Sequence, residues 1–203
     1  SMINTIMETC HKLPNTNVDE VSRALSLCDK RIISNKYLFG GMGDGGGCHP
    51  RDNIALSYLA DKLNLSYNWY NNIMQQREKQ TEWLANLCIE NKLNNKINIL
   101  GKCFKPETNL ILGSPSILLK NILEEKGEEV NIWDPWVDEE DTDIVAKKYN
   151  WDKEPQLYFI GTKHEVWNKF YFKKNDVVID PFRYLNLNND VKYIPIGDNT
   201  WKQ

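Results

Sequence analysis

The sequence has 203 residues, enough for one large domain or two small ones. Its net charge is −3 and it has no basic block, which argues against a nucleic-acid-binding protein. No apolar run approaches the roughly 20 residues that a membrane-spanning helix needs, and no secretory signal is visible. The five cysteines lack CxxC spacing, which argues against a zinc site. The chain is neither short nor cysteine-dense, which argues against a disulfide framework and favours reduced thiols in the cytoplasm.

The first part of the chain predicts helices. Apolar residues recur at helical spacing over 3–13 and again over 19–27, and Pro14 separates the two segments. Residues 53–65 predict a third helix. Residues 67–93 form the longest helical pattern, which exceeds the usual length of a globular helix. We therefore expect this last helix to pack along another element or along a second subunit, and we predict a homodimer.

From about residue 95 the pattern alternates short apolar strands with helices. Ser114-Pro115 predicts a helix start, since serine caps helices and proline suits their first position, and Gly127 marks the end of that helix. Strand candidates are residues 97–100, 130–133, 157–160, 177–179 and 191–196. This alternation predicts right-handed crossovers and a mostly parallel sheet. The predicted fold is therefore α/β, with a helical domain over 1–94 and a Rossmann-like three-layer domain over 95–203.

The most informative stretch is a glycine-rich loop that ends in a cysteine. Residues 41–46 match the dinucleotide pattern GxGxxG literally. That fingerprint must connect a strand to a helix in a βαβ unit. Here predicted helices precede it, and Cys48-His49-Pro50 is expected to precede the next helix. The dinucleotide interpretation is therefore disfavoured.

Two interpretations of Cys48 remain. An isolated cysteine is usually a buried, inert side chain. However, Cys48 follows Gly45, Gly46 and Gly47, which allow close backbone approach to a ligand, and it lies near a helix start and next to a cation, Arg51. Such surroundings favour a reactive thiolate. The second interpretation is thus a catalytic nucleophile.

Six short motifs, in order along nearly the whole chain, resemble those of the UDP-glucose/GDP-mannose dehydrogenase family. The glycine loop through Asp52 resembles the signature GGxCxP(K/R)D, and the family's DxRI precedes it at nearly the observed distance. The other four are LGxxFKPxT, an SP helix start, a strand-ending YDP, and ATxHxE. The matching segments of this sequence are residues 45–52, 29–32, 100–108, 114–115, 133–135 and 161–165.

The resemblance implies an enzyme that oxidises the C6 alcohol of a nucleotide sugar to a carboxylate with two NAD⁺, through a thiohemiacetal and a thioester on a cysteine. Cys48 would be the nucleophile and Asp52 would help to organise the water. Residues expected to contact the UDP-sugar or to shape its site are Arg31, Tyr37, Gly45, Gly46, Gly47, Arg51, Lys105 and Arg183. Tyr37 needs a one-residue gap to match, and the match at Arg183 is loose. UDP-glucose is the favoured substrate.

The sequence departs from the family in two respects. The family's DDxRESP pattern is replaced by Asn109-Leu110-Ile111-Leu112-Gly113-Ser114-Pro115, so its acidic residues and arginine are missing. The amino-terminal NAD-binding domain of the family has no counterpart in these 203 residues. We therefore expect no cofactor-binding residue in this chain, and no activity from this chain alone.

Two other functions are compatible with the sequence. The chain could dimerise and bind a nucleotide sugar without chemistry, although a pure binder has no need for the pair Cys48 and Asp52. An unrelated cysteine hydrolase would need a histidine base near Cys48. His11 and His164 are available, and their spacing favours neither.

Overall fold

The structure is a computed structural model that describes residues 13–27, 41–43, 45–94, 96–149, 151 and 153–197. The chain divides into two compact units, which are described separately. The helical unit comprises residues up to 39 together with 48–77. The α/β unit comprises 40–47 and 78–203. The predicted domain boundary near residue 94 stays a prediction, since a compact unit need not coincide with a domain.

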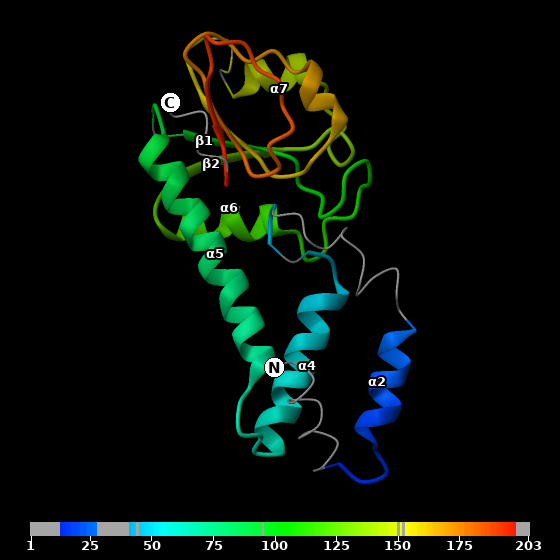
Figure 1. The fold of residues 1–203 in the computed structure, drawn as a ribbon. Helices are drawn as coiled ribbons and strands as arrows, with labels where there is room; N and C mark the ends of the chain where they lie inside the picture. Colours follow the sequence, from blue (N-terminus) through cyan, green and yellow to red (C-terminus); the bar gives the residue numbers. More distant parts are fainter. Residues whose placement is uncertain are drawn as a thin grey trace. The chain divides into compact units, whose positions relative to one another are not determined.

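The helical unit contains α2 (Val18–Ser26), α4 (Cys48–Lys62) and the first part of α5 (Trp69–Asn91) (Figure 1). Asn17 caps α2, because its side chain accepts a hydrogen bond from the amide of Asp19. Between α4 and α5, the Asn68 side chain accepts from the amide of Asn71 and donates to the carbonyl of Ser57. The turn between these two helices is therefore fixed by one amide side chain.

The predicted start of α4 was wrong. The sequence pattern placed it at Asn53, but the helix begins at Cys48 and ends at Lys62. Pro50 is accommodated because the amides of a first helical turn have no partner within the helix, so a residue without one is tolerated there. One argument against a dinucleotide fingerprint therefore fails. The other argument, that helices precede the loop, concerns residues just before it that lie outside the described ones, so it stays a prediction. The structure adds a different observation, because α4 leads into α5 rather than into a strand.

The α/β unit contains a sheet of five parallel strands in the order β2-β1-β3-β4-β5. This confirms the predicted α/β class and parallel sheet. The strands are β1 (Lys96–Leu100), β2 (Glu129–Trp133), β3 (Leu157–Ile160), β4 (Val177–Asp180) and β5 (Lys192–Pro195). The helices are α6 (Pro115–Glu125), α7 (Thr142–Lys148) and the 3-10 helix η2 (Glu165–Lys169). Ser114 caps α6 and Pro115 is its first residue, as predicted.

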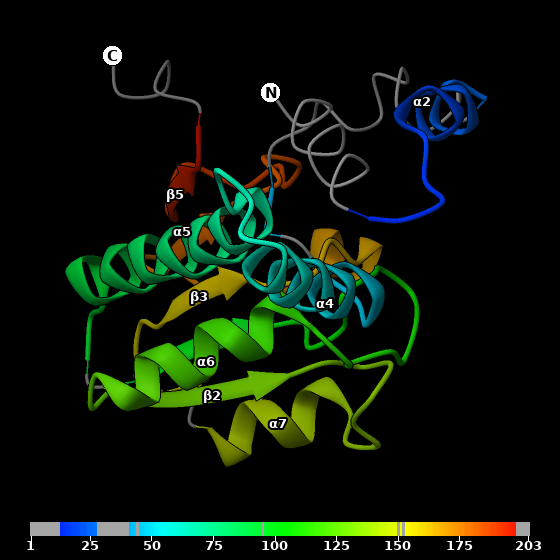
Figure 2. The ribbon, with the colours of Figure 1, turned by 90° about the horizontal axis from the view of Figure 1, so that it is seen from below.

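Alternating strand residues build a core on each face of the sheet. One face carries Ile99 and Phe159, which pack with α6 and with the second half of α5 through Leu84. The other face carries Tyr158, which packs with Trp133 and with α7. Figure 2 shows α6 and α7 on opposite sides of β2. The three-layer arrangement leaves the carboxyl edge of the sheet as the place where the connecting loops gather.

Within the described residues, no helix combines the length and the apolar character that crossing a bilayer requires.

Candidate functional site

The strand order creates a switch point between β1 and β3. From β1 the chain continues to β2 on one side, whereas β3, β4 and β5 follow on the other side. In open parallel sheets, ligands bind beyond the carboxyl ends of the strands at such a point, because the two adjacent loops diverge there. Here these are the loop after β1 and the loop after β3. The fold therefore places a candidate binding site at the loops that follow Leu100 and Ile160.

The loop after β1, residues 101–113, is named the lysine loop because it carries Lys105. Gly101 has φ of +106°, and a Cβ at this position would lie 2.5 Å from Cβ of Thr162 in the loop after β3. Glycine is therefore required where the two loops meet. The Lys105 side chain is exposed, with Nζ 5.2 Å from the centre of the Phe104 ring. Its ammonium group is thus presented to solvent at the switch point.

The glycine loop, residues 41–47 of which Asp44 is not described, packs on the lysine loop. Gly46 has φ of +87°, and a Cβ there would lie 2.9 Å from the Phe104 ring. Its amide donates a hydrogen bond to the carbonyl of Gly113 at 3.2 Å. Gly45 packs against Phe104 and Pro115, and Gly47 packs against Leu112. Sequence motifs about 60 residues apart, one with the glycines and one with Lys105, are therefore in contact.

These contacts give the glycines a structural explanation. They allow the loop to lie flat against Phe104 and Gly113, where any side chain at Gly46 would collide. The amide of Gly46 already has a protein partner. The predicted contact of Gly45, Gly46 and Gly47 with a sugar nucleotide stays a prediction.

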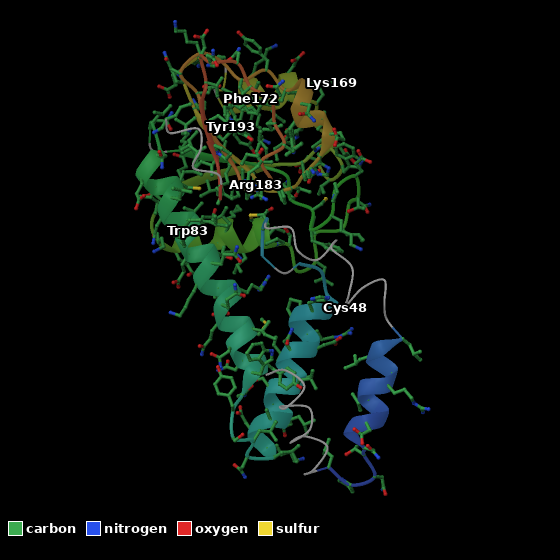
Figure 3. All side chains as sticks on the ribbon, in the orientation of Figure 1. Cys48, Trp83, Lys169, Phe172, Arg183 and Tyr193 are labelled. Atoms are coloured by element: carbon green, nitrogen blue, oxygen red, sulfur yellow. The ribbon has the colours of Figure 1, made fainter. Side chains whose placement is uncertain are left out.

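Cys48 is the first residue of α4, directly after the glycine loop, and its side chain is exposed (Figure 3). Arg51 and Asp52 follow at positions three and four residues later, on the same helical face. Arg51 Nε donates to Asp52 Oδ1 at 2.8 Å. The hydrogen bond and charge of Asp52 raise the pKa of Arg51, and the charge of Cys48 contributes further. The structure therefore brings together the thiol, cation and carboxylate that the sequence singled out.

Arg183, which is labelled in Figure 3, follows β4 in the chain, in the loop beyond Asp180. Its backbone has φ of +58°. Nη1 of its side chain donates to the carbonyls of Pro181 and Ile196 at 2.6 and 2.7 Å. The guanidinium therefore joins the loop after β4 to the end of β5, and a role in binding the substrate stays a prediction. Arg31 and Tyr37 lie outside the described residues.

At the switch point the structure brings together three side chains for which no role was predicted, namely Cys103, Asp134 and His164. All three are buried, and their ligand-type atoms lie within 4.8 Å of one another. Burial raises the pKa of Asp134, but hydrogen bonds from His164 and from the amides of Trp136 and Lys102 outweigh that effect and hold it at about 2. The signal was available, because Asp134 and His164 each lie in a motif shared with the family.

The same group resembles a cation site in composition, but its atoms already have partners. The Cys103 thiol donates to the carbonyl of Thr108 at 2.7 Å. Burial and the charge of Asp134 raise the pKa of Cys103 to about 12, so this thiol keeps its proton at neutral pH. Among the described residues, these three are thus explained by hydrogen bonds within the protein.

The residues at the glycine loop do not fit an NAD site. A dinucleotide site needs the loop between a strand and a helix that returns to a neighbouring parallel strand. Here α4 continues into α5. No step of a reaction is therefore derived through NAD from these residues.

Comparison with known proteins agrees with the fold and the motifs. The central-domain model of the UDP-glucose/GDP-mannose dehydrogenase family matches residues 1–79. UDP-glucose 6-dehydrogenase of Rattus norvegicus is 34% identical over 69% of this chain, and UDP-glucose 6-dehydrogenase TuaD of Bacillus subtilis is 30% identical over 66%. The chain spans only 29% of the length of each of these relatives.

Solved structures show the same fold. A ternary complex of GDP-mannose dehydrogenase from Pseudomonas aeruginosa superposes with a TM-score of 0.75, at 20% identity, over 95% of this chain and 48% of that chain. A UDP-glucose dehydrogenase from Pyrobaculum islandicum superposes with a TM-score of 0.64, at 21% identity, over 95% of this chain and 46% of that chain. The solved structures thus share the fold, and the sequence relatives together with the family match show that the chain belongs to the UDP-glucose/GDP-mannose dehydrogenase family.

Proposed function

We propose that this chain is the part of an NAD-dependent nucleotide-sugar dehydrogenase that binds the nucleotide sugar and carries the reactive thiol. The proposed reaction oxidises the C6 alcohol of UDP-glucose to a carboxylate. The observation that carries the proposal is the exposed Cys48 at the start of α4, with Arg51 and Asp52 on the same helical face. NAD⁺ is the proposed oxidant, and it is assigned to no residue of this chain.

Cys48 acts on the C6 aldehyde that the first oxidation produces. Its sulfur forms a bond to C6, and a proton goes to the former carbonyl oxygen, which gives a thiohemiacetal. Oxidation of that adduct yields a thioester, and water then cleaves its C–S bond to release the carboxylate and the thiol. Asp52 orients that water, and the Arg51 cation stabilises negative charge beside the sulfur. A helix start adds the positive end of the helix dipole.

Lys105 binds the negatively charged diphosphate of the substrate. It is exposed at the switch point of the sheet, which is where ligands bind in such folds. A lysine ammonium is a common partner for phosphate oxygens. Arg31, Tyr37 and Arg183 complete the proposed set of substrate contacts.

The proposed assembly is a homodimer in the cytoplasm. Its support is the apolar surface of α4, where Ile54 and Tyr58 are four residues apart and are 59% and 69% exposed. Large apolar side chains on one face of a helix are stabilised when a partner covers them.

A covalent trapping experiment tests the proposed chemistry without NAD. The 203-residue protein is incubated with the C6 aldehyde of UDP-glucose, and the thiohemiacetal is detected without reduction, as a mass increase in native mass spectrometry. The wild-type protein should gain the mass of one aldehyde, and Cys48→Ser should abolish this gain. Cys88→Ala is the matched control, because Cys88 is buried and should not react. Adduct elsewhere, or none in the wild-type protein, would remove Cys48 from the mechanism.

Calorimetry tests the binding step separately. UDP-glucose and UDP should bind more tightly than GDP-mannose. This order of affinities would show that the site prefers uracil to guanine. Binding of UDP-glucose without any adduct from the aldehyde would favour the alternative of a nucleotide-sugar-binding module without catalysis.

A further inference from the structure

The buried carboxylate of Asp134 ties the loop after β2 to the start of the lysine loop. Its Oδ2 accepts hydrogen bonds from the amides of Lys102 at 2.7 Å and Cys103 at 3.1 Å. Its Oδ1 accepts from the amide of Trp136 at 2.9 Å. The side chain is fully buried. A buried carboxylate holds its hydrogen-bond donors firmly in place, because the loss of any donor would leave part of its negative charge uncompensated.

His164, in the loop after β3, joins this carboxylate to the middle of the lysine loop. Nε2 lies 3.0 Å from Asp134 Oδ2, and Nδ1 lies 2.9 Å from the amide nitrogen of Glu107. The amide can only donate, so Nδ1 is the acceptor and the ring proton is on Nε2, directed at Asp134. The geometry therefore requires one neutral tautomer of His164.

The plane of the His164 ring is also fixed. The Trp136 ring stacks on it with centroids 4.3 Å apart and an interplanar angle of 7°. Trp167 meets the imidazole edge-on at 5.8 Å. The hydroxyl of Tyr184 donates to the His164 carbonyl at 2.7 Å. With both the ring plane and the main chain held, the two nitrogens can point only at Glu107 and Asp134.

The bonds to Asp134 and His164 lie on either side of Lys105 in the chain. Asp134 binds the amides of Lys102 and Cys103, and His164 binds the amide of Glu107. Glu107 has φ of +56°, a conformation that costs a residue with a side chain energy unless its surroundings impose it. The hydrogen bond from its amide to His164 stabilises that conformation. Lys105 therefore lies at the top of a loop fixed on both sides.

We propose that the Asp134–His164 pair is a positioning device that holds the lysine loop in the conformation in which Lys105 meets the diphosphate of a nucleotide sugar. This inference rests on the proposed function for its ligand, but not for the order of the loop. The pair acts through Lys105 and does not touch the reacting atoms. The Phe104 ring belongs to the lysine loop and packs on the glycine loop. By holding the lysine loop, the Asp134–His164 pair therefore also supports the glycine loop, which leads to Cys48.

Two substitutions of His164 separate its two hydrogen bonds. His164→Asn places a carboxamide oxygen where Nδ1 accepts from Glu107 and gives up the bond to Asp134. His164→Gln places a carboxamide nitrogen near the position of Nε2, keeps the bond to Asp134 and removes the acceptor for Glu107. Val177→Ala, in the buried start of β4, is the control for a general loss of stability.

The ligand-independent measurement is NMR on the free 203-residue protein. Imidazole ¹⁵N shifts should show a protonated Nε2 and an unprotonated Nδ1 for His164 at neutral pH. Hydrogen exchange at the Glu107 amide should be slow in the wild-type protein and in His164→Asn, and fast in His164→Gln. A doubly protonated ring, or a rapidly exchanging Glu107 amide in the wild-type protein, would overturn the positioning role.

The ligand-dependent measurement is calorimetry with UDP. His164→Asn should bind within about threefold of wild type, and His164→Gln about tenfold more weakly, because one ordering hydrogen bond is lost. Val177→Ala should bind like wild type although it is less stable. If His164→Gln binds as tightly as wild type, the pair does not position Lys105. If wild-type protein binds no UDP, the proposed function fails, and the NMR result alone decides whether the pair orders the loop.

Discussion

The two compact units bury their apolar side chains to very different extents. In the α/β unit every residue of β3 and β4 is buried, and helices cover both faces of the sheet. In the helical unit, α4 has 15 residues and buries only Ala60. The α/β unit therefore contains its own core. The helical unit leaves large apolar side chains exposed, so its stability should depend on another surface. The proposed nucleophile Cys48 and its neighbour Arg51 lie in this more exposed unit.

The largest expected difference between the units is in thiol reactivity. Cys48 is exposed, whereas Cys103 is buried with its pKa raised to about 12 by burial and by the charge of Asp134. At pH 8 a thiol with that pKa is thiolate in only about one molecule in ten thousand. Iodoacetamide should therefore modify Cys48 at least a hundredfold faster than Cys103, as followed by peptide mass spectrometry. Equal rates would mean that the lysine loop opens readily, which contradicts the positioning inference.

The next largest expected difference is in the response to truncated side chains. Phe159→Ala, at the centre of the α/β core, should lower the free energy of unfolding by about 3–5 kcal/mol. Ile54→Ala, on the exposed surface of α4, should change it by less than about 0.5 kcal/mol at protein concentrations where the chain is monomeric. Urea denaturation measures both. A large loss in the free energy of unfolding for Ile54→Ala would show that α4 is covered within a single chain. The helical unit would then not differ from the α/β unit in the way stated.

Much of the α/β unit could be predicted from sequence, because fully buried parallel strands are short uninterrupted apolar runs. The predicted strands at 130–133, 157–160 and 177–179 each lie within one residue of the observed bounds. The cap by Ser114 was also predicted, since capping depends only on neighbouring residues. The start of α4 was not, because Pro50 suggests a break, and only the structure shows that it lies in a first turn where proline is tolerated.

The candidate site was only partly predictable for a different reason. Cys48, Arg51 and Asp52 are neighbours in sequence, so a local motif was enough to group them. Asp134 and His164 are 30 residues apart and follow different strands. Only the order of the strands puts their loops together at the switch point. A rule that groups polar residues following parallel strands would have identified the pair, without revealing which nitrogen of His164 accepts from Glu107.

The third expected effect concerns association. We expect the exposed surface of α4 to form the dimer contact, so the double substitution Ile54→Lys and Tyr58→Glu should weaken dimerisation at least tenfold in sedimentation equilibrium. Ile144→Lys is the matched control, because Ile144 is also exposed, at 54%, but lies on α7 of the α/β unit. A dimer that survives the double substitution but dissociates with Ile144→Lys would move the interface to the other unit.

The smallest expected effect concerns how acid unfolds the self-contained α/β unit. The pKa of Asp134 in the folded protein is about 2, below its ordinary value of 3.8, so folding favours its ionised form. Its contribution to stability is therefore present above about pH 4 and is lost as the pH falls toward 2; it should be on the order of 1 kcal/mol. Asp134→Asn should reduce the loss of stability over this pH range, as measured by urea denaturation at each pH.

Asp176 offers a control of opposite sign, because burial raises its pKa. The contribution of Asp176 is lost as the pH rises above about 4, so Asp176→Asn should make stability increase more steeply with pH. If Asp134→Asn leaves the acid response unchanged, the carboxylate is not held ionised by His164 and the loop amides, and the α/β unit owes its acid stability to other groups.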